Sequence, residues 1–288
     1  MNNTRMSNFF DMVNERWHGY NTLVCIGLDS DYSKIPSVVK DKSVDIETGM
    51  TNFNCQIIDA TADLVCAYKP NMAFYEHNGF EGLRALKHTF EYLHGKYPNI
   101  PVILDAKKAD ISSTNIGYVN AIFNFFEADA VTVHPYLGKE AIQPFLDQKN
   151  KGIFVLCRSS NPGAGEFQDL KVRYNGKAIP LYQYVALQVA QKWNMYGNCG
   201  LVMGATYPTE IKNVRKLVGD IPFLVPGIGS QSGDLEKTVV AGLDSYKVGL
   251  IINSARSIIF SSDKVDFADS ARAHTQELRN QINGYRQQ

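Results

Sequence analysis

Residues 101–114 read PVILDAKKADISST, an apolar run that ends in alternating charges. Seven other runs have the same form: a short apolar, β-branched stretch, a polar or glycine-rich end, and then a segment with helical periodicity. The eight runs begin at Leu23, Leu64, Pro101, Ala128, Gly152, Gly200, Pro222 and Ser245. Nearly continuous apolar strands that alternate with helices are typical of a parallel sheet with both faces covered.

The number of runs predicts an α/β fold of the (β/α)8 TIM-barrel type. Eight units in 288 residues leave about 36 residues for each strand and helix. A doubly wound open sheet is the alternative topology. We expect residues 1–288 to form a single domain. Residues 159–180, rich in Gly, Pro and Asn, are expected to be a loop inserted after the fifth strand, over one mouth of the barrel.

The composition excludes several classes of protein. Lysine and arginine together number 29, as do aspartate and glutamate, so the net charge gives no general attraction for nucleic acid or an acidic membrane. The five cysteines form no C-x-x-C pair, which favours reduced thiols. A polar N-terminus without an apolar core, and no apolar run of about 18 residues, favour a cytoplasmic protein.

Charged residues gather where the predicted strands end, which is where barrels carry their chemistry. Alternation along a strand places Asp105 and Lys107 on the same side, with Asp110 on the following turn. Lys69 and Asp29 end two other strands. A surface ladder of salt bridges is the simpler interpretation. A charge that continues an apolar strand is costly unless it is used, which favours a functional array.

The last two strands predict a phosphate site. Residues 226–233 read PGIGSQSG, and residues 254–257 read SARS after the eighth strand. Glycine-rich turns at these two places form the usual phosphate cup of a barrel, and Arg256 supplies a charge-assisted bond. An ordinary turn is the alternative for PGIGSQSG alone. We expect this turn to be mobile when the site is empty.

These motifs together resemble the orotidine 5′-phosphate decarboxylase family, and in particular its longer bacterial subfamily. The similarity runs from Leu23 to about Phe260 and includes GLD, YKP, LDAKKADIxxT, CRSSNPGA and PGIGSQSG…SARS in order. Related phosphosugar barrels share only the short DxKxxD block. One departure is Lys108-Ala109, where the family often has Arg-Gly; it leaves the charged groups in place.

The resemblance implies decarboxylation of orotidine 5′-phosphate (OMP) to uridine 5′-phosphate (UMP) in pyrimidine biosynthesis, with no cofactor and no metal. Lys107 would protonate C6 of the pyrimidine. Each site would be completed across a homodimer interface. The implied catalytic residues are Lys69, Asp105, Lys107 and Asp110, the last reaching the neighbouring site together with Thr114. The implied substrate contacts are Asp29 and Thr114 for the ribose, Ser159 or Ser160 for the pyrimidine edge, and Pro226, Gly229, Gln231, Ala255 and Arg256 around the phosphate.

Two other functions fit parts of this pattern. A sugar-phosphate lyase of the same barrel class would need a divalent metal, and the six scattered histidines offer no H-E-x-x-H motif for one. A catalytically silent barrel that senses nucleotides would keep Arg256 and the glycine turn while tolerating loss of Asp105 or Lys107. Both of these residues are present, which favours the enzyme.

Overall fold

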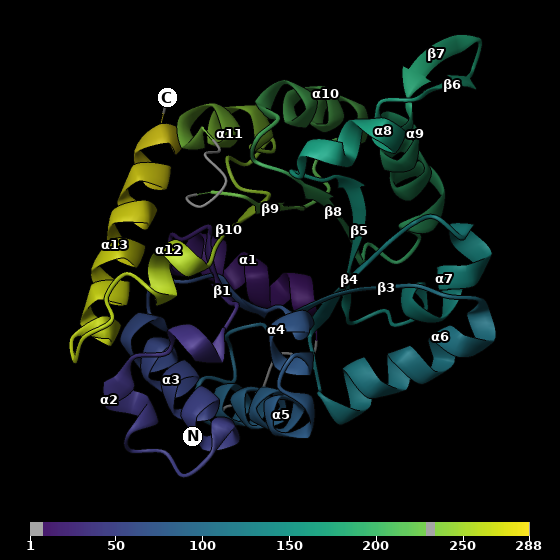
Figure 1. Ribbon diagram of the computed structural model, residues 1–288. Helices are drawn as coiled ribbons and strands as arrows, with labels where there is room; N and C mark the ends of the chain where they lie inside the picture. Colours follow the sequence, from purple (N-terminus) through teal and green to yellow (C-terminus); the bar gives the residue numbers. More distant parts are fainter. Residues whose placement is uncertain (1–7, 229–233, 288) are drawn as a thin grey trace.

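The computed structural model describes residues 8–228 and 234–287, and a ring of eight parallel strands forms its centre (Figure 1). The hydrogen-bonded order is β2-β1-β10-β9-β8-β5-β4-β3. Isolated parallel bridges, Tyr68 with Val102 and Asn71 with Asp105, connect β2 to β3. The two ends of the sheet therefore meet, and the predicted barrel, not the open sheet, is confirmed.

Each of the eight predicted runs supplies one strand of the barrel, in order. The eighth strand begins later than its run, because Asp244 Oδ1 accepts bonds from the Tyr246 and Val248 N–H groups and holds residues 244–248 in a turn. The strands are β1 Val24–Leu28, β2 Ala67–Pro70, β3 Ile103–Lys108, β4 Ala130–Val133, β5 Gly152–Arg158, β8 Cys199–Met203, β9 Phe223–Pro226 and β10 Leu250–Ser254.

Helices surround the barrel and bury one face each. In α3, for example, a reciprocal cap between Asp45 and Thr48 starts the helix, and Met50, Phe53 and Ile57 lie on its buried face. No helix within residues 8–228 and 234–287 combines the length and the apolar character needed to cross a membrane. The helices are α1 Phe9–Gly19, α2 Ser37–Lys40, α3 Ile46–Thr61, α4 Met72–Glu76, α5 Gly79–Lys96, α6 Ser112–Val119, α7 Gly138–Leu146, α8 Gly165–Gln168, α9 Leu181–Gln188, α10 Pro208–Val218, α11 Leu235–Gly242, α12 Arg256–Ile259 and α13 Phe267–Arg286, with short 3-10 turns η1 Tyr32–Lys34 and η3 Pro162–Ala164 and π-helical ends η2 Asn120–Phe125 and η4 Val189–Trp193.

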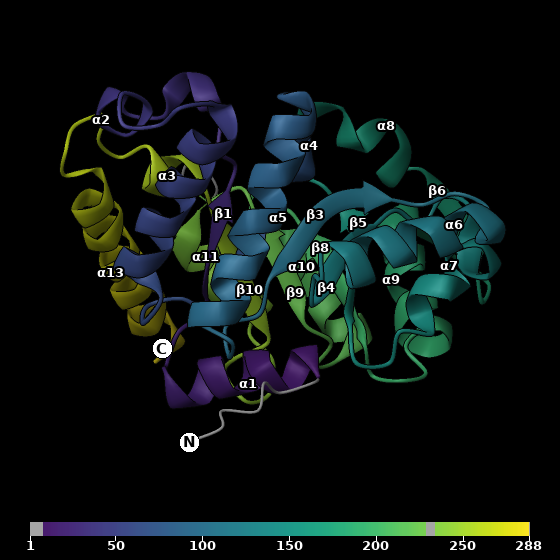
Figure 2. The ribbon, with the colours of Figure 1, turned by 90° about the horizontal axis from the view of Figure 1, so that it is seen from below.

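Helix α1 covers the amino-terminal end of the barrel (Figure 2). The Phe9 ring packs edge-on against Phe154 of β5, at 5.7 Å between ring centroids. Gly152 leaves room for this ring, because a Cβ there would collide with it. Arg16, near the other end of α1, donates to the Val65 and Ala62 carbonyls. This end is therefore closed, and access to the barrel is from the carboxyl ends of the strands.

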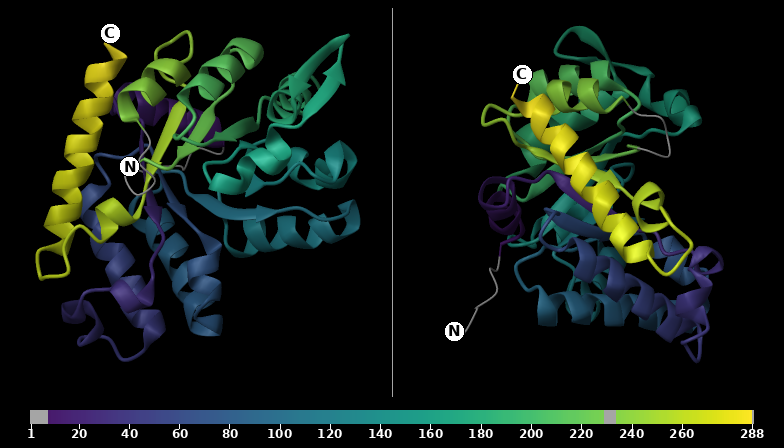
Figure 3. Two further views of the ribbon diagram at one scale, coloured as in Figure 1. Left: turned by 45° about the horizontal axis from the view of Figure 1, so that its top comes forward. Right: turned by 90° about the vertical axis from the view of Figure 1, so that its left-hand side faces the viewer.

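The inserted segment contains regular structure that was expected to be loop. After η3 and α8, strands β6 Lys171–Tyr174 and β7 Lys177–Pro180 form an antiparallel hairpin that projects from the barrel (Figures 1 and 3). Asn175 and Gly176 make its turn with φ values of 49° and 77°. Asn-Gly is the usual pair for a two-residue hairpin turn in which both residues have positive φ. The expectation that the whole segment is irregular was therefore wrong.

Candidate active site

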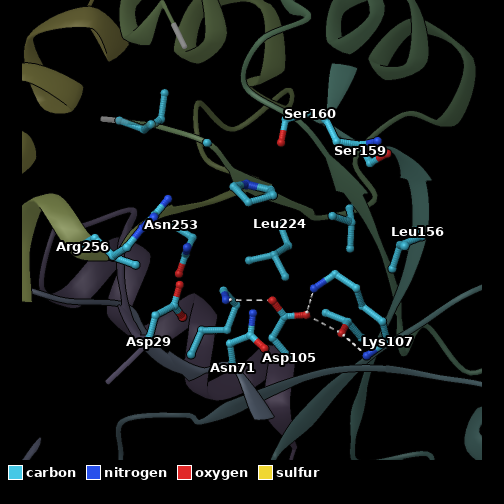
Figure 4. A pocket seen from close by; sticks show the side chains of 18 residues that line it. Asp29, Asn71, Asp105, Lys107, Leu156, Ser159, Ser160, Leu224, Asn253 and Arg256 are labelled. Atoms are coloured by element: carbon cyan, nitrogen blue, oxygen red, sulfur yellow. Dashed lines mark hydrogen bonds and ion pairs between the residues drawn. The ribbon is translucent and has the colours of Figure 1, made fainter. Parts of the chain in front are cut away.

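A cavity of about 270 Å³ opens among the carboxyl ends of the barrel strands (Figure 4). Residues from all eight barrel strands, or from the turns that follow them, line it together. The predicted site residues found in its wall are Asp29, Lys69, Asp105, Lys107, Ser159, Ser160, Pro226, Ala255 and Arg256. The barrel thus assembles residues separated by more than 200 positions in the chain.

Asp105 lies between two ammonium groups at the bottom of this cavity. Lys69 Nζ is 3.0 Å from Asp105 Oδ2, and Lys107 Nζ is 2.6 Å from Oδ1 (Figure 4). The Lys69 side chain is only 3% exposed, whereas that of Lys107 is 49% exposed. One lysine is therefore fixed inside the barrel wall, and the other reaches the open cavity.

Electrostatics keeps this array charged. Burial favours the neutral forms of Asp105 and Lys69, but their mutual attraction outweighs it. Burial alone would raise the pKa of the Asp105 carboxyl, but the charges of Lys69 and Lys107 hold this pKa well below its usual range. The pKa of Lys69 is raised by Asp105 and Asp29. The cavity floor thus contains a carboxylate whose charged form Lys69 and Lys107 stabilise.

The strand that carries Asp105 and Lys107 is not regular, in contrast to the alternation expected from the sequence. Leu104 pairs with Val131 and Lys108 with Val133, so the register shifts between these two pairs. Lys107 has a φ of 47°, in the left-handed region that non-glycine residues rarely adopt. Asp105 and Lys107 do face the same cavity, but a β-bulge brings them together.

Asp29 follows β1, and one of its carboxylate oxygens lacks a hydrogen-bond donor in the described residues. Its Oδ1 is buried and finds no hydrogen-bond partner among residues 8–228 and 234–287. Burial raises the pKa of this carboxyl, although Lys69 opposes the change. A buried acceptor without a donor is costly. The position therefore suits a ligand that brings hydroxyl groups.

The two candidate serines have different surroundings. The N–H of Ser159 donates to Gln168 Oε1 at 3.0 Å, and Gln168 Nε2 donates to the Ser159 hydroxyl at 2.8 Å. That hydroxyl also donates to Asn161 Oδ1. In Figure 4 the Ser160 oxygen points into the cavity. Helix α8 of the insertion, which carries Gln168, thus binds Ser159 and leaves Ser160 facing the cavity.

The predicted phosphate residues lie partly within the described chain. Pro226, Ala255 and Arg256 line the cavity, and Arg256 lies on the side away from Lys107 (Figure 4). Gly229 and Gln231 lie outside the described residues, as does most of the turn that we expected to be mobile. Those expectations stay predictions.

Asp110 and Thr114 do not line the cavity of their own chain. Asp110 caps the turn after β3, where its Oδ1 accepts from the Ile111 N–H group and its own N–H donates to Asn115 Oδ1. Thr114 is exposed on α6. Both residues therefore lie outside the cavity that contains the charged array of the same chain.

Several residues of the cavity were not predicted from the sequence. The polar ones are Asn71, Thr132, Asn161 and Asn253, and the apolar wall includes Leu156, Val202 and Leu224. Thr132 and Asn253 interrupt otherwise apolar strands, and that signal could have found them. The apolar residues carried no such signal, because every barrel strand is apolar.

Comparison with known proteins identifies the family. The model of the "Orotidine 5'-phosphate decarboxylase / HUMPS family" matches residues 22–271. The chain belongs to this family. The resemblance drawn from the sequence motifs is confirmed.

Two relatives that match nearly the whole chain have the same name. A protein from Cellvibrio japonicus named "Orotidine 5'-phosphate decarboxylase" is 46% identical over 275 residues, which cover 96% of this chain and 98% of the relative. A protein of the same name from Ralstonia nicotianae is also 46% identical, with 96% and 99% covered. The solved OMP decarboxylase of Leishmania donovani superimposes with a TM-score of 0.82 at 34% identity, covering 98% of this chain and 99% of that one.

Proposed function

We propose that Lys107 donates the proton that takes the place of the departing carboxylate at C6 of OMP. The overall reaction of the chain is the decarboxylation of OMP to UMP, the activity predicted from the sequence and supported by the family and its full-length relatives. The observation that carries the role of Lys107 is its position: an ammonium at the open cavity, 2.6 Å from a buried carboxylate that is itself bound by Lys69.

The chemistry of the reaction requires such a cation. When the C6–carboxylate bond breaks, carbon dioxide leaves and the electron pair stays on C6, in an orbital that the pyrimidine ring cannot delocalise. A fixed ammonium beside C6 stabilises this charge as it develops. Lys107 then transfers a proton to C6. Because half of its side chain is exposed, solvent can return a proton to the neutral amine.

The remaining contacts follow from the shape and charges of the cavity. Arg256 binds the phosphate on the side away from Lys107, with Pro226, Gly229, Gln231 and Ala255 around it. The buried Asp29 Oδ1, which has no hydrogen-bond partner in residues 8–228 and 234–287, accepts from ribose hydroxyls. Ser160 reads the pyrimidine edge, since its side-chain oxygen points into the cavity (Figure 4). The phosphate binds far from C6, and its binding energy stabilises the arrangement of charged groups in which the reaction occurs.

The active enzyme is a cytoplasmic homodimer in this proposal, with the whole chain acting as one domain. Asp110 and Thr114 reach the cavity of the neighbouring copy, where Asp110 extends the alternating charges and Thr114 contacts the ribose. Two observations support this arrangement. Neither residue lines its own cavity. Ile111, just before α6, and Ile116, on α6, have exposed apolar side chains. Such side chains suit an interface between copies.

The decisive test is substitution of Lys107. We expect Lys107→Ala to lower kcat by more than about 1,000-fold, because both the stabilising cation and the proton are lost. The loss of OMP absorbance measures turnover, and calorimetry with UMP measures binding, which should persist. Lys108→Ala is the matched control: it removes the adjacent lysine, which is paired with Glu76 outside the cavity. Full turnover in the Lys107 variant would refute the proposal.

A further inference from the structure

Thr132 is a buried polar residue in an apolar strand of the barrel. It lies in β4, and its neighbours Ala130, Val131 and Val133 are apolar. Its side chain is 1% exposed overall yet contributes to the wall of the catalytic cavity. A valine would fill the same volume without burying a hydroxyl, so the hydroxyl is expected to have a specific use.

The hydroxyl occupies the point where the β3–β4 ladder is interrupted. Three residues of β3, 105–107, face the single residue Thr132 of β4, because the flanking pairs are Leu104 with Val131 and Lys108 with Val133. A strand with extra residues bends and loses regular ladder bonds there. The N–H of Lys107 is one group that the bulge removes from the regular pattern. It donates to Thr132 Oγ1 at 2.9 Å.

The same hydroxyl reaches the catalytic carboxylate. Thr132 Oγ1 donates its hydrogen to Asp105 Oδ1 at 2.8 Å, the oxygen that also accepts from Lys107 Nζ. One oxygen atom thus links the main chain of Lys107 to the side chain of Asp105. Lys69 holds the other carboxylate oxygen. Together these bonds leave the Asp105 carboxylate little freedom to rotate.

We propose that Thr132 is a positioning residue for the decarboxylation: its hydroxyl fixes the bulge that turns Lys107 and Asp105 into the cavity at a set separation. The left-handed backbone of Lys107 costs free energy, so it needs local bonds to persist. The Thr132 bond to the Lys107 N–H supplies one of them. This inference rests on the proposed role of Lys107 and adds a residue of the cavity wall that contacts both Lys107 and Asp105.

The test compares three variants of Thr132. Thr132→Val keeps the volume and removes the hydroxyl, and we expect kcat to fall about 10- to 100-fold with KM changed less than about 3-fold, because a small misplacement of reacting groups slows chemistry more than binding. Thr132→Ser keeps the hydroxyl and should stay within about 5-fold of the parent enzyme. Thr132→Ala, compared with Thr132→Ser, isolates the hydroxyl if the valine variant does not fold.

A matched control separates positioning from general damage. Thr275 is a buried threonine of α13 whose hydroxyl donates to the Ala271 carbonyl, away from the cavity. Thr275→Val loses an equally buried hydroxyl and should leave kcat unchanged. Equal losses in the two valine variants, or no rescue by serine, would overturn the inference. Lys107→Ala is assayed alongside: if it is inactive while Thr132→Val is fully active, the inference alone fails, and if it is active, the proposed function fails.

Discussion

The two ends of the barrel are built from the same strands but have opposite chemistry. At the amino-terminal end α1 lies across the opening, and Phe9 packs on Phe154 in a dry, apolar contact. At the carboxyl end β3 bulges, Lys107 has a left-handed backbone, and a buried Asp29 oxygen has no donor within the described chain. The first end is closed by packed apolar side chains, whereas the second presents charges and a buried acceptor to the cavity. The comparison indicates that stability and catalysis are separated along the barrel axis.

The largest expected effect is on activity, and it tests whether a second copy of the chain completes the carboxyl end of the barrel. If the carboxyl end is completed by a partner, Lys107→Ala and Asp110→Asn should each be nearly inactive alone. Mixed and allowed to exchange subunits, they form heterodimers in which one site has both Lys107 and Asp110. With equal amounts and random exchange, activity should recover to about a quarter of that of the parent enzyme.

The absorbance assay measures this recovery, and size-exclusion chromatography measures the assembly. Mixing Lys107→Ala with Lys107→Ala Asp110→Asn is the control, because no combination of these chains has an intact site. A mixture of the two single variants that stays inactive although heterodimers form would contradict a shared site. It would leave the carboxyl end as self-contained as the amino-terminal end.

The second prediction concerns the closed end. Phe9→Ala removes a fully buried ring, and truncations of this kind cost about 3–5 kcal/mol of unfolding free energy. Chemical denaturation should report this loss, while kcat per folded molecule stays the same. Phe80→Ala, which truncates an exposed ring on α5, should change neither quantity. A fall in kcat with Phe9→Ala would show that the two ends are coupled.

The same division explains what could be predicted from sequence. The eight strands were found because apolar runs repeat. The bulge at Lys107 was not found, since it depends on pairing between β3 and β4 that residue alternation does not encode. The role of Gln168 was also hidden, because a contact from the insertion to Ser159 requires the folded chain.

The β6–β7 hairpin was missed for a different reason. Asn175-Gly176, a typical hairpin turn pair, is present in the sequence. The many Gly, Pro and Asn residues around it favoured the prediction of a loop over residues 159–180. The partner-site roles of Asp110 and Thr114 come from family resemblance only.

The smallest expected effect tests whether the carboxyl end gives up stability for binding. Burial raises the pKa of Asp29, so the folded chain holds this proton more tightly than the unfolded chain does. The ionised carboxylate therefore lowers stability at pH 7, and this penalty disappears as the pH falls below the pKa values of both states. Asp29→Asn should raise the Tm of the free protein at pH 7, by less than about 4 °C, and raise the KM for OMP.

Asp31, two residues away, provides the contrast of opposite sign. Bonds from Ser33 lower the pKa of its carboxyl, so ionised Asp31 adds stability at pH 7 that is lost as the solution is acidified through the folded-state pKa. Asp31→Asn should therefore lower the Tm slightly and leave the KM for OMP unchanged. Thermal unfolding at pH 7 and at pH 4 distinguishes the pair, because the gain from Asp29→Asn should shrink at the lower pH. A lower Tm for Asp29→Asn at pH 7 would mean that this carboxylate stabilises the fold, and the carboxyl end would then resemble the closed end in serving stability.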